Sequence, residues 1–291
     1  MLILIPILKS YTDYTLYKGE LQRKKAISAG PAFACFAKYC QICAPFRPGY
    51  PSLTRNGTVK KPSQRRQRAG IRHFMTMDFS NIRNLVFDLG GVIIDLDRDE
   101  SVRRLQAIGL TQADALLDPY KQSGVFLDLE TGRITAPLFL DRVRTMIAEN
   151  GHAVPSDLEI QDAFNGFLVG LPVERLRALE ALRKRGYRLF AISNTNPLMF
   201  HSRIESNFRA DGKTIRDYFD GIVTSFEEGA CKPDPLIFNR LMNRYALRPD
   251  ETLLFDDSPA NVEGARRRGL NAVRVGYTPQ DDMLHYASLL K

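Results

Sequence analysis

Aspartates follow two short apolar segments that lie far apart in the chain. Asp88 comes directly after Asn84–Phe87, and Asp256 and Asp257 come directly after 252–255. Short apolar runs of this kind are typical of strands buried on both faces of a parallel sheet. The carboxyl ends of such strands border the crevice where open α/β sheets bind ligands. Three carboxylates at that edge would repel one another unless a cation lay among them, so the sequence predicts a Mg²⁺ site around a nucleophilic aspartate.

Strand and helix patterns alternate from residue 82 onward, as is typical of an α/β, doubly wound (Rossmann-like) parallel sheet. The predicted strands are 82–87, 187–192, 221–224, 252–255 and 272–275, with a short hairpin at 92–96. The predicted helices are 101–108, 112–117, 136–149, 158–167 and 173–185, followed by helices that begin near Pro235 and Pro259. Proline in the first turn and glycine after the last turn are ordinary helix boundaries, and Gly186 and Gly269 occupy such end positions.

A block of helices interrupts this alternation after the first strand. Residues 98–171 lack strong strand runs, whereas 77–97 and 172–291 contain the strands of the sheet. We therefore predict a Rossmann-like core formed by 77–97 and 172–291, into which 98–171 is inserted as a small helical cap domain.

The basic charge of the chain belongs to its first 76 residues. They hold 14 of the 41 Lys and Arg residues but only two of the 33 acidic ones, which leaves 27 basic and 31 acidic residues in the remainder. We expect this basic extension, 1–76, to be a disordered, solvated segment, so no nucleic-acid partner is expected. Alternatively, translation starts at Met75 or Met77 and the extension is a mis-assigned start.

The cysteines favour a reducing compartment. Cys35, Cys40 and Cys43 lie in the extension and only Cys231 lies beyond it, so no disulfide framework is apparent and the cytoplasm is the expected location. The first three match part of an iron–sulfur ligand set, but a fourth ligand is missing. The apolar run 1–9 is too short to span a bilayer, so no membrane partner is expected.

Four motifs at the ends of the predicted strands together resemble the haloacid dehalogenase (HAD) superfamily of phosphatases. They are Phe-Asp-Leu-Gly-Gly-Val at 87–92, Ile-Ser-Asn-Thr-Asn at 192–196, Cys-Lys-Pro-Asp-Pro-Leu-Ile-Phe at 231–238 and Phe-Asp-Asp-Ser-Pro-Ala-Asn-Val at 255–262. The resemblance covers residues 80–276 and leaves out the extension. It implies a Mg²⁺-dependent phosphatase that hydrolyses a small phosphorylated metabolite through an aspartyl-phosphate intermediate.

The chemistry of the residues agrees with this resemblance. A carboxylate ionised at neutral pH can attack phosphorus and form an acyl phosphate, which makes Asp88 the expected nucleophile. Magnesium prefers oxygen ligands and commonly takes one or two carboxylates. The resemblance implies that the carboxylates of Asp88 and Asp257 and the carbonyl of Gly90 bind the metal, with Asp256 behind them.

The remaining motifs supply groups for the phosphate. Lys232 would neutralise charge on Asp88 and on the phosphate, as lysine does in other phosphoryl-transfer sites. The Ser193 hydroxyl and the backbone N–H of Asn194 are suited to hold phosphate oxygens. Each residue also has a simpler interpretation, because Asp256 or Ser258 could cap the following helix and Lys232 could be a surface residue.

Gly90 departs from the pattern of the active phosphatases. Most of them carry a second aspartate at this position, which protonates the leaving group and later activates water. Sugar-phosphate phosphatases with glycine here are known in the superfamily, bacterial α-D-glucose-1-phosphate phosphatase among them, so a sugar phosphate is a candidate substrate. An anomeric phosphate is a good leaving group and needs less protonation. Asp95 is a remote candidate for the missing acid.

Two alternative functions stay open. A 2-haloacid dehalogenase would use Asp88 to attack carbon without a metal, although Asp256 and Asp257 argue against it. A catalytically weak protein would bind a phosphorylated ligand through the cap. The cap residues that could select the substrate are Tyr120, Lys121, Phe126, Glu130 and Arg133, and the sequence does not rank them. We expect a monomer or a homodimer.

Overall fold

The computed structural model describes residues 79–118, 120–209, 212–276 and 280–290. These residues belong to the structural unit Thr58–Lys291, and the other unit, Met1–Gly57, lies outside the described residues. The predictions for the basic extension 1–76, including its start and its three cysteines, therefore also lie outside them. No helix in the described part of the chain is long and apolar enough to cross a membrane.

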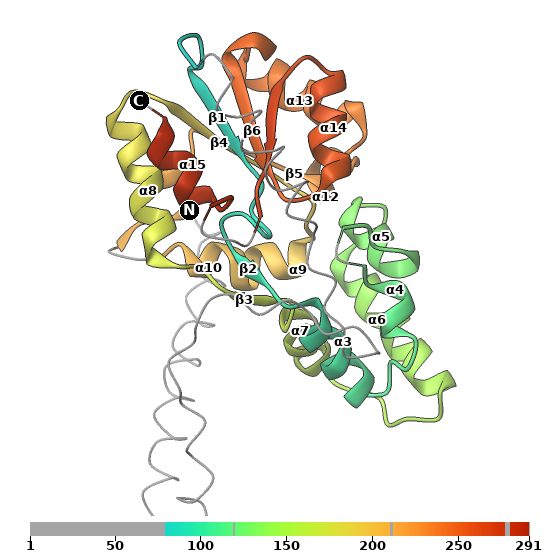
Figure 1. Ribbon diagram of the computed structural model, residues 1–291. Helices are drawn as coiled ribbons and strands as arrows, with labels where there is room; N and C mark the ends of the chain where they lie inside the picture. The colour runs from blue at the N-terminus through green and yellow to red at the C-terminus, as the bar shows by residue number, and fades with distance from the viewer. Residues whose placement is uncertain (1–78, 119, 210–211, 277–279, 291) are drawn as a thin grey trace, which may run out of the picture. The chain divides into compact units, whose positions relative to one another are not determined.

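A five-stranded parallel sheet forms the centre of the described chain, in the order β5-β4-β1-β6-β7 (Figure 1). Its strands are β1 (Asn84–Phe87), β4 (Arg188–Ser193), β5 (Gly221–Thr224), β6 (Thr252–Asp256) and β7 (Asn271–Arg274). Helices connect the strands, as right-handed parallel crossovers require. The predicted α/β, doubly wound fold class is confirmed, and each predicted core strand is found within one or two residues of its expected ends.

Helices cover both faces of this sheet, with α8 and α15 on one side and α13 and α14 on the other (Figure 1). The helices in this part of the chain are α8 (Val173–Lys184), α9 (Pro197–Met199), the π-helical turn η2 (Phe200–Ile204), α10 (Glu205–Asn207), α11 (Ile215–Tyr218), α12 (Ser225–Glu228), α13 (Pro235–Tyr245), the 3₁₀ turn η4 (Pro249–Glu251), α14 (Pro259–Arg267) and α15 (Met283–Leu289). Adjacent residues of β1 point to opposite faces, so Val86 packs in one apolar layer and Leu85 and Phe87 pack in the other.

Along the sequence, an inserted helical region lies between β1 and the next strand of the sheet, β4. It consists of α3 (Arg98–Ala107), α4 (Ala113–Leu116), α5 (Gly124–Glu130), α6 (Ala136–Glu149) and α7 (Asp157–Asn165). α6 has the predicted bounds, and the side chain of Thr135 caps its first turn. α5 was not predicted, because it begins at Gly124 with a positive φ and has no capping side-chain hydrogen bond.

A second, two-stranded sheet joins the inserted region to the core. β2 (Asp95–Leu96) pairs antiparallel with β3 (Leu168–Gly170), so the two ends of the insertion lie side by side. The predicted hairpin at 92–96 was wrong, because the strand pairs with a segment more than seventy residues later. The two strands are too short for a sequence period to reveal them.

Candidate active site

Three aspartates meet at the carboxyl edge of the central sheet. Phe87 and Phe255 are paired in register on β1 and β6, and their rings stack with centroids 4.9 Å apart. The next residue of each strand is an aspartate, so the register brings Asp88 beside Asp256 and Asp257. Carboxylate oxygens of all three lie within 4.8 Å of one another, and all three residues are buried. The convergence expected from the sequence is therefore present in the structure.

Lys232 lies behind this group with its ammonium fully enclosed. Its Nζ donates to Asp88 Oδ2 at 2.9 Å, to Asp256 Oδ2 at 2.7 Å and to the carbonyl oxygen of Ile192 at 3.0 Å. An ammonium has three protons, so these partners use all of its hydrogen-bonding capacity. The contact with phosphate expected from the sequence would require Lys232 to share one of these protons with a phosphate oxygen.

The pKa values of Asp88 and Lys232 depend on their burial and on the charges of the neighbouring residues. Burial raises the pKa of Asp88, Lys232 opposes the increase, and the charges of Asp256 and Asp257 add to it, which gives about 8. Burial alone would lower the pKa of Lys232, but Asp256 and Asp88 outweigh it and raise the pKa above its ordinary value. Lys232 is therefore charged at neutral pH, and Asp88 needs a further positive charge nearby to be ionised.

A divalent cation fits the donor set that these residues present. The three carboxylates offer closely spaced hard oxygen ligands, which suit Mg²⁺. Asp88, Gly90 and Asp257 line the pocket described below, whereas the Asp256 carboxylate is fully buried and accepts hydrogen bonds from Ser258 N at 2.9 Å and Asn261 Nδ2 at 3.0 Å. Ser258 is the N-cap residue of α14, but its side chain makes no capping hydrogen bond. Asp256 instead accepts a hydrogen bond from the backbone N–H of this N-cap residue.

The loop after β4 fixes the backbone around Lys232. The Asn194 side chain donates through Nδ2 to the carbonyl of Lys232 at 2.9 Å, and its Oδ1 accepts from the backbone N–H of Lys232 at 2.7 Å. The sequence did not reveal this side-chain role of Asn194. Ser193 is buried at the end of β4 and lines the pocket, as a phosphate-binding hydroxyl requires.

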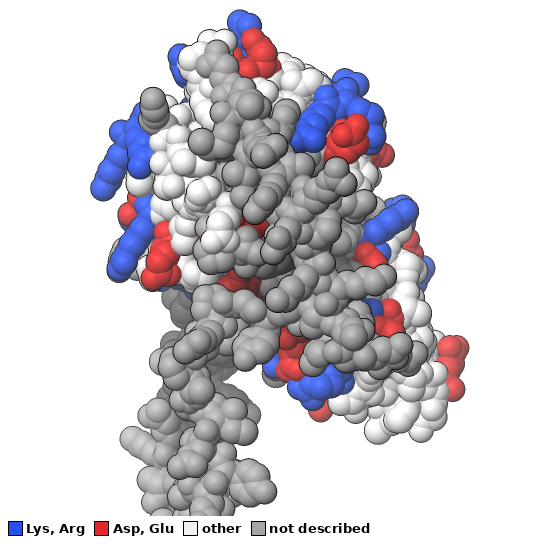
Figure 2. Space-filling view, in the orientation of Figure 1, with Lys and Arg blue, Asp and Glu red and all other residues white. Residues whose placement is uncertain are grey.

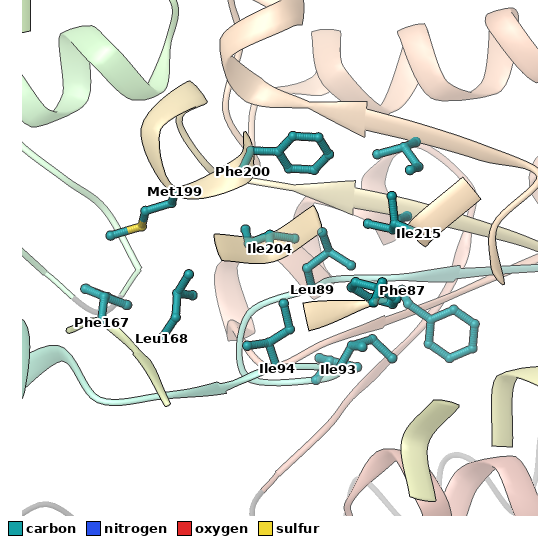
Figure 3. Packing of buried hydrophobic residues seen from close by; sticks show 14 of the residues in the cluster. Phe87, Leu89, Ile93, Ile94, Phe167, Leu168, Met199, Phe200, Ile204 and Ile215 are labelled. Atoms are coloured by element: carbon teal, nitrogen blue, oxygen red, sulfur yellow. The ribbon is translucent and has the colours of Figure 1, made fainter. Parts of the chain in front are cut away.

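A tight turn follows Asp88 and presents Gly90 to the pocket. Backbone N–H groups of Ile93 and Ile94 donate to the carbonyl of Leu89, and the apolar side chains of these three residues pack into the core (Figure 3). The N–H of Leu89 donates to Asp88 Oδ1 at 2.7 Å. With Oδ2 held by Lys232, both oxygens of Asp88 are fixed in orientation.

A pocket opens over the aspartates, between the core and the inserted region. Its core residues come from the turn after Asp88, the loop after β4, α9, η2 and the loop before α14, and the inserted region contributes Tyr120, Gln122, Glu130 and Phe164. The apolar part of the lining includes Phe167, Leu168, Met199 and Ile204, which lie together in Figure 3. The pocket is therefore a mixed apolar and polar chamber directly above the carboxylates.

The structure ranks the cap residues that the sequence left unranked. Tyr120 and Glu130 line the pocket. Phe126 packs in the core of the inserted region, with its ring 5.0 Å from those of Phe139 and Phe164. Arg133 pairs with Asp128, and Lys121 is exposed. The remote candidate Asp95 is instead paired with Arg175, at 2.7 Å.

A family model described as haloacid dehalogenase-like hydrolase matches residues 82–269. The chain therefore belongs to the haloacid dehalogenase-like hydrolases. Among curated proteins it is similar to D-ribitol-5-phosphate phosphatase from Bacteroides thetaiotaomicron, with 35% identity over 188 residues that cover 65% of this chain and 89% of the relative. It is also similar to phosphoserine phosphatase from Thermus thermophilus, with 30% identity over 182 residues that cover 60% of this chain and 69% of the relative.

Solved structures show the same family. A HAD family enzyme from Bacteroides thetaiotaomicron, in complex with magnesium and inorganic phosphate, matches with a TM-score of 0.62 and 32% identity, over 67% of this chain and 95% of the other. A predicted HAD-like family hydrolase from Porphyromonas gingivalis matches with a TM-score of 0.61 and 38% identity, over 67% of this chain and 91% of the other.

Proposed function

We propose that this chain is a Mg²⁺-dependent phosphatase that hydrolyses the phosphate ester of a small sugar or sugar alcohol. The observation that carries the proposal is the group of three buried carboxylates, of which Asp88 and Asp257 line a pocket while Asp256 and Lys232 lie buried behind them. The structural relative that contains magnesium and inorganic phosphate supports the same chemistry. The inserted region would act as the cap that closes over the substrate and excludes water.

In the proposed reaction, Asp88 attacks phosphorus and forms an aspartyl phosphate, which water then hydrolyses. The hydrogen bonds from Leu89 N and Lys232 Nζ hold the carboxylate of Asp88 in one orientation, which favours attack along a single line. Asp88, Asp257 and the Gly90 carbonyl would hold Mg²⁺, which supplies positive charge to the phosphate when bound. Ser193 and the backbone N–H of Asn194 would hold phosphate oxygens, with Lys232 sharing a proton with them.

The pocket lining favours a neutral leaving group. Among its described residues it contains no Lys, Arg or His, whereas Tyr120, Gln122 and Asn196 offer uncharged hydrogen-bonding groups beside apolar walls. Arg274 lies beside this lining, but it already contacts Tyr120 and donates to the carbonyl of Asp257 at 3.0 Å, so a second phosphate or a carboxylate on the substrate would have to compete with these partners. A hydroxylated, uncharged carbon chain suits it, and the similarity to D-ribitol-5-phosphate phosphatase agrees. The cytoplasm, and a monomer or homodimer, stay as predictions.

A panel of phosphate esters tests the proposal with the full chain. We expect Mg²⁺-dependent release of phosphate from ribitol 5-phosphate or α-D-glucose 1-phosphate, at least about tenfold faster in kcat/KM than from phosphoserine, whose leaving group is charged. EDTA and Asp88→Asn should abolish turnover, whereas the surface variant Asp250→Asn should not. No turnover of any ester would contradict the proposal, and chloride release from 2-chloropropionate would favour the dehalogenase alternative.

A further inference from the structure

The proposed reaction needs a proton donor for the leaving group, and Gly90 cannot provide one. A Cβ at this position would lie 2.9 Å from Cδ1 of Leu96, so the Leu96 side chain would have to shift to admit one. The position therefore has no side chain that could donate a proton. An alkoxide leaving group departs slowly without protonation, so the acid must come from another wall of the pocket.

Glu130 is the carboxylic acid that the inserted region contributes to the pocket. It lies at the end of α5, is 6% exposed, and lines the pocket together with Asp88 and Gly90. Its Oε1 accepts a hydrogen bond from the thiol of Cys231 at 3.5 Å, and no described Lys, Arg or His forms an ion pair with it. A buried acid without a cationic partner is unusual in a structural role, because burial without pairing destabilises the charged form.

Two contacts hold Glu130 and the turn that follows it against the core, one with the loop that contains Lys232 and one with α12. Cys231 directly precedes Lys232, so Glu130 contacts the same loop that supplies the ammonium beside Asp88. The turn after Glu130 packs on α12, where Gly132 has a φ of +65° and approaches the carbonyl of Phe226 so closely that a Cβ would collide with it. The position of the carboxyl is therefore fixed with respect to the core, as proton transfer demands.

We propose that Glu130 is the general acid and base of the phosphatase reaction, in place of an aspartate at the position of Gly90. In the first step Asp88 forms a bond to phosphorus, the bond from phosphorus to the leaving oxygen breaks, and the carboxyl proton of Glu130 passes to that oxygen. In the second step water attacks the aspartyl phosphate, its proton returns to the Glu130 carboxylate, and the bond from phosphorus to Asp88 breaks. This inference rests on the proposed phosphatase function.

The ionisation of the surrounding groups agrees with this assignment. Burial raises the pKa of Glu130 to about 7, against the effects of Cys231 and Lys232, so both protonation states are accessible near neutral pH. Burial raises the pKa of the Cys231 thiol to about 12, which leaves it protonated. Tyr120 also lines the pocket, but burial raises the pKa of its phenol above the ordinary value, so it is a poor base at neutral pH.

Pre-steady-state kinetics of Glu130→Gln test the assignment. p-Nitrophenolate leaves without a proton, so with p-nitrophenyl phosphate the variant should release one equivalent of p-nitrophenolate in a burst, followed by turnover about 100-fold or more below wild type. With ribitol 5-phosphate the first step itself should slow by a similar factor and no burst of product should appear. Asp128→Asn, which removes an acid from the outer side of the same helix, should behave as wild type.

Other outcomes separate this inference from the proposed function. Turnover of Glu130→Gln within threefold of wild type on both esters, or a change in KM alone, would overturn the role of Glu130 while leaving the phosphatase intact. If the variant does not fold, kcat/KM of the wild-type protein is measured for a series of aryl phosphates instead. A steep dependence of kcat/KM on the pKa of the leaving group would show that no acid protonates the leaving group, which would overturn the role of Glu130. An inactive wild type, with Asp88→Asn unchanged from it, would instead reject the phosphatase.

Discussion

At the scale of single residues, the site depends on one lysine that has no spare proton. Lys232 is fully buried and joins Asp88, Asp256 and the carbonyl of Ile192, while Asn194 holds its backbone through two hydrogen bonds. Breaking a buried ion pair from one side leaves an uncompensated charge, which is much worse than removing both partners. Lys232 therefore has a structural role in addition to the catalytic role that we propose for it.

Lys232→Met should lower both stability and activity. It leaves Asp88 and Asp256 buried beside each other without the ammonium, so we expect the free energy of unfolding to fall by about 3–5 kcal/mol. The phosphatase rate should fall as well, because the charge on Asp88 is no longer offset. Urea denaturation and phosphate release measure the two effects, with the exposed Lys184→Met as the matched control. A variant as stable as Lys184→Met would contradict this description of the site.

The residues of the proposed active site were partly predictable from the sequence. Asp88, Asp256 and Asp257 each lie at or directly after a strand end, so the general geometry of parallel sheets was enough to bring them together, whereas Lys232 lies beyond α12 and was identified through the resemblance to the HAD motifs. Glu130 was named among five cap candidates for substrate selection, but it could not be ranked above the others, because its local sequence resembles an ordinary helix end followed by a glycine turn. Which face of an inserted helix meets the core is a tertiary property that the short pattern around Glu130 does not contain.

At the scale of elements, the turn after α5 connects the inserted region to α12 of the core. Gly132 permits this approach because it has no side chain and adopts a positive φ. The sequence predicted the strands and the long helix α6 well, since their apolar periods are sustained and α6 has a capping threonine. It missed α5 and the β2–β3 pair, whose lengths are too small for a period to appear.

Gly132→Ala tests the contact between α5 and α12. Left-handed backbone alone costs an alanine about 1 kcal/mol, and the collision with the Phe226 carbonyl adds to it. Gly151→Ala is the matched control, because Gly151 also has a positive φ but nothing lies within 4 Å of the added Cβ. We expect Gly132→Ala to be the less stable in thermal unfolding and to lose turnover, while Gly151→Ala keeps it. Equal behaviour of the two variants would argue against the contact.

At the scale of the whole molecule, the acidic groups of the pocket make folding depend on pH. The net charge of residues 77–291 is small, with 27 basic and 31 acidic residues. On the face shown in Figure 2, basic and acidic side chains of the described residues lie next to one another. Burial is the largest cause of the raised pKa values of Asp88 and Glu130, the two acids of the pocket with a raised pKa. Asp88 shows the larger increase, from 3.8 to about 8, but it is paired with Lys232, whereas Glu130, raised from 4.5 to about 7, has no ion-pair partner among the described residues.

The raised pKa of Glu130 predicts that stability falls as pH rises. The folded protein binds this proton more tightly than the unfolded chain, so the contribution is complete below about pH 4.5 and is lost as pH rises through about 7. For a shift of this size the loss is about 3 kcal/mol. Urea denaturation of the protein in EDTA, at pH 5 and pH 8, should show this fall in wild type and a smaller one in Glu130→Gln. The exposed Glu159→Gln is the control, and parallel curves for wild type and Glu130→Gln would refute the prediction.

The pairing of β1 with β6 has a consequence for the two neighbouring aspartates. Successive residues on an extended chain face opposite ways, so Asp256 turns inward to the ammonium of Lys232 while Asp257 turns outward to the pocket. A shift of the two strands by a single position would exchange these directions and turn Asp256, instead of Asp257, toward the pocket where we propose that Mg²⁺ binds. The register in which the apolar strands pair during folding thus determines whether the proposed active site can form.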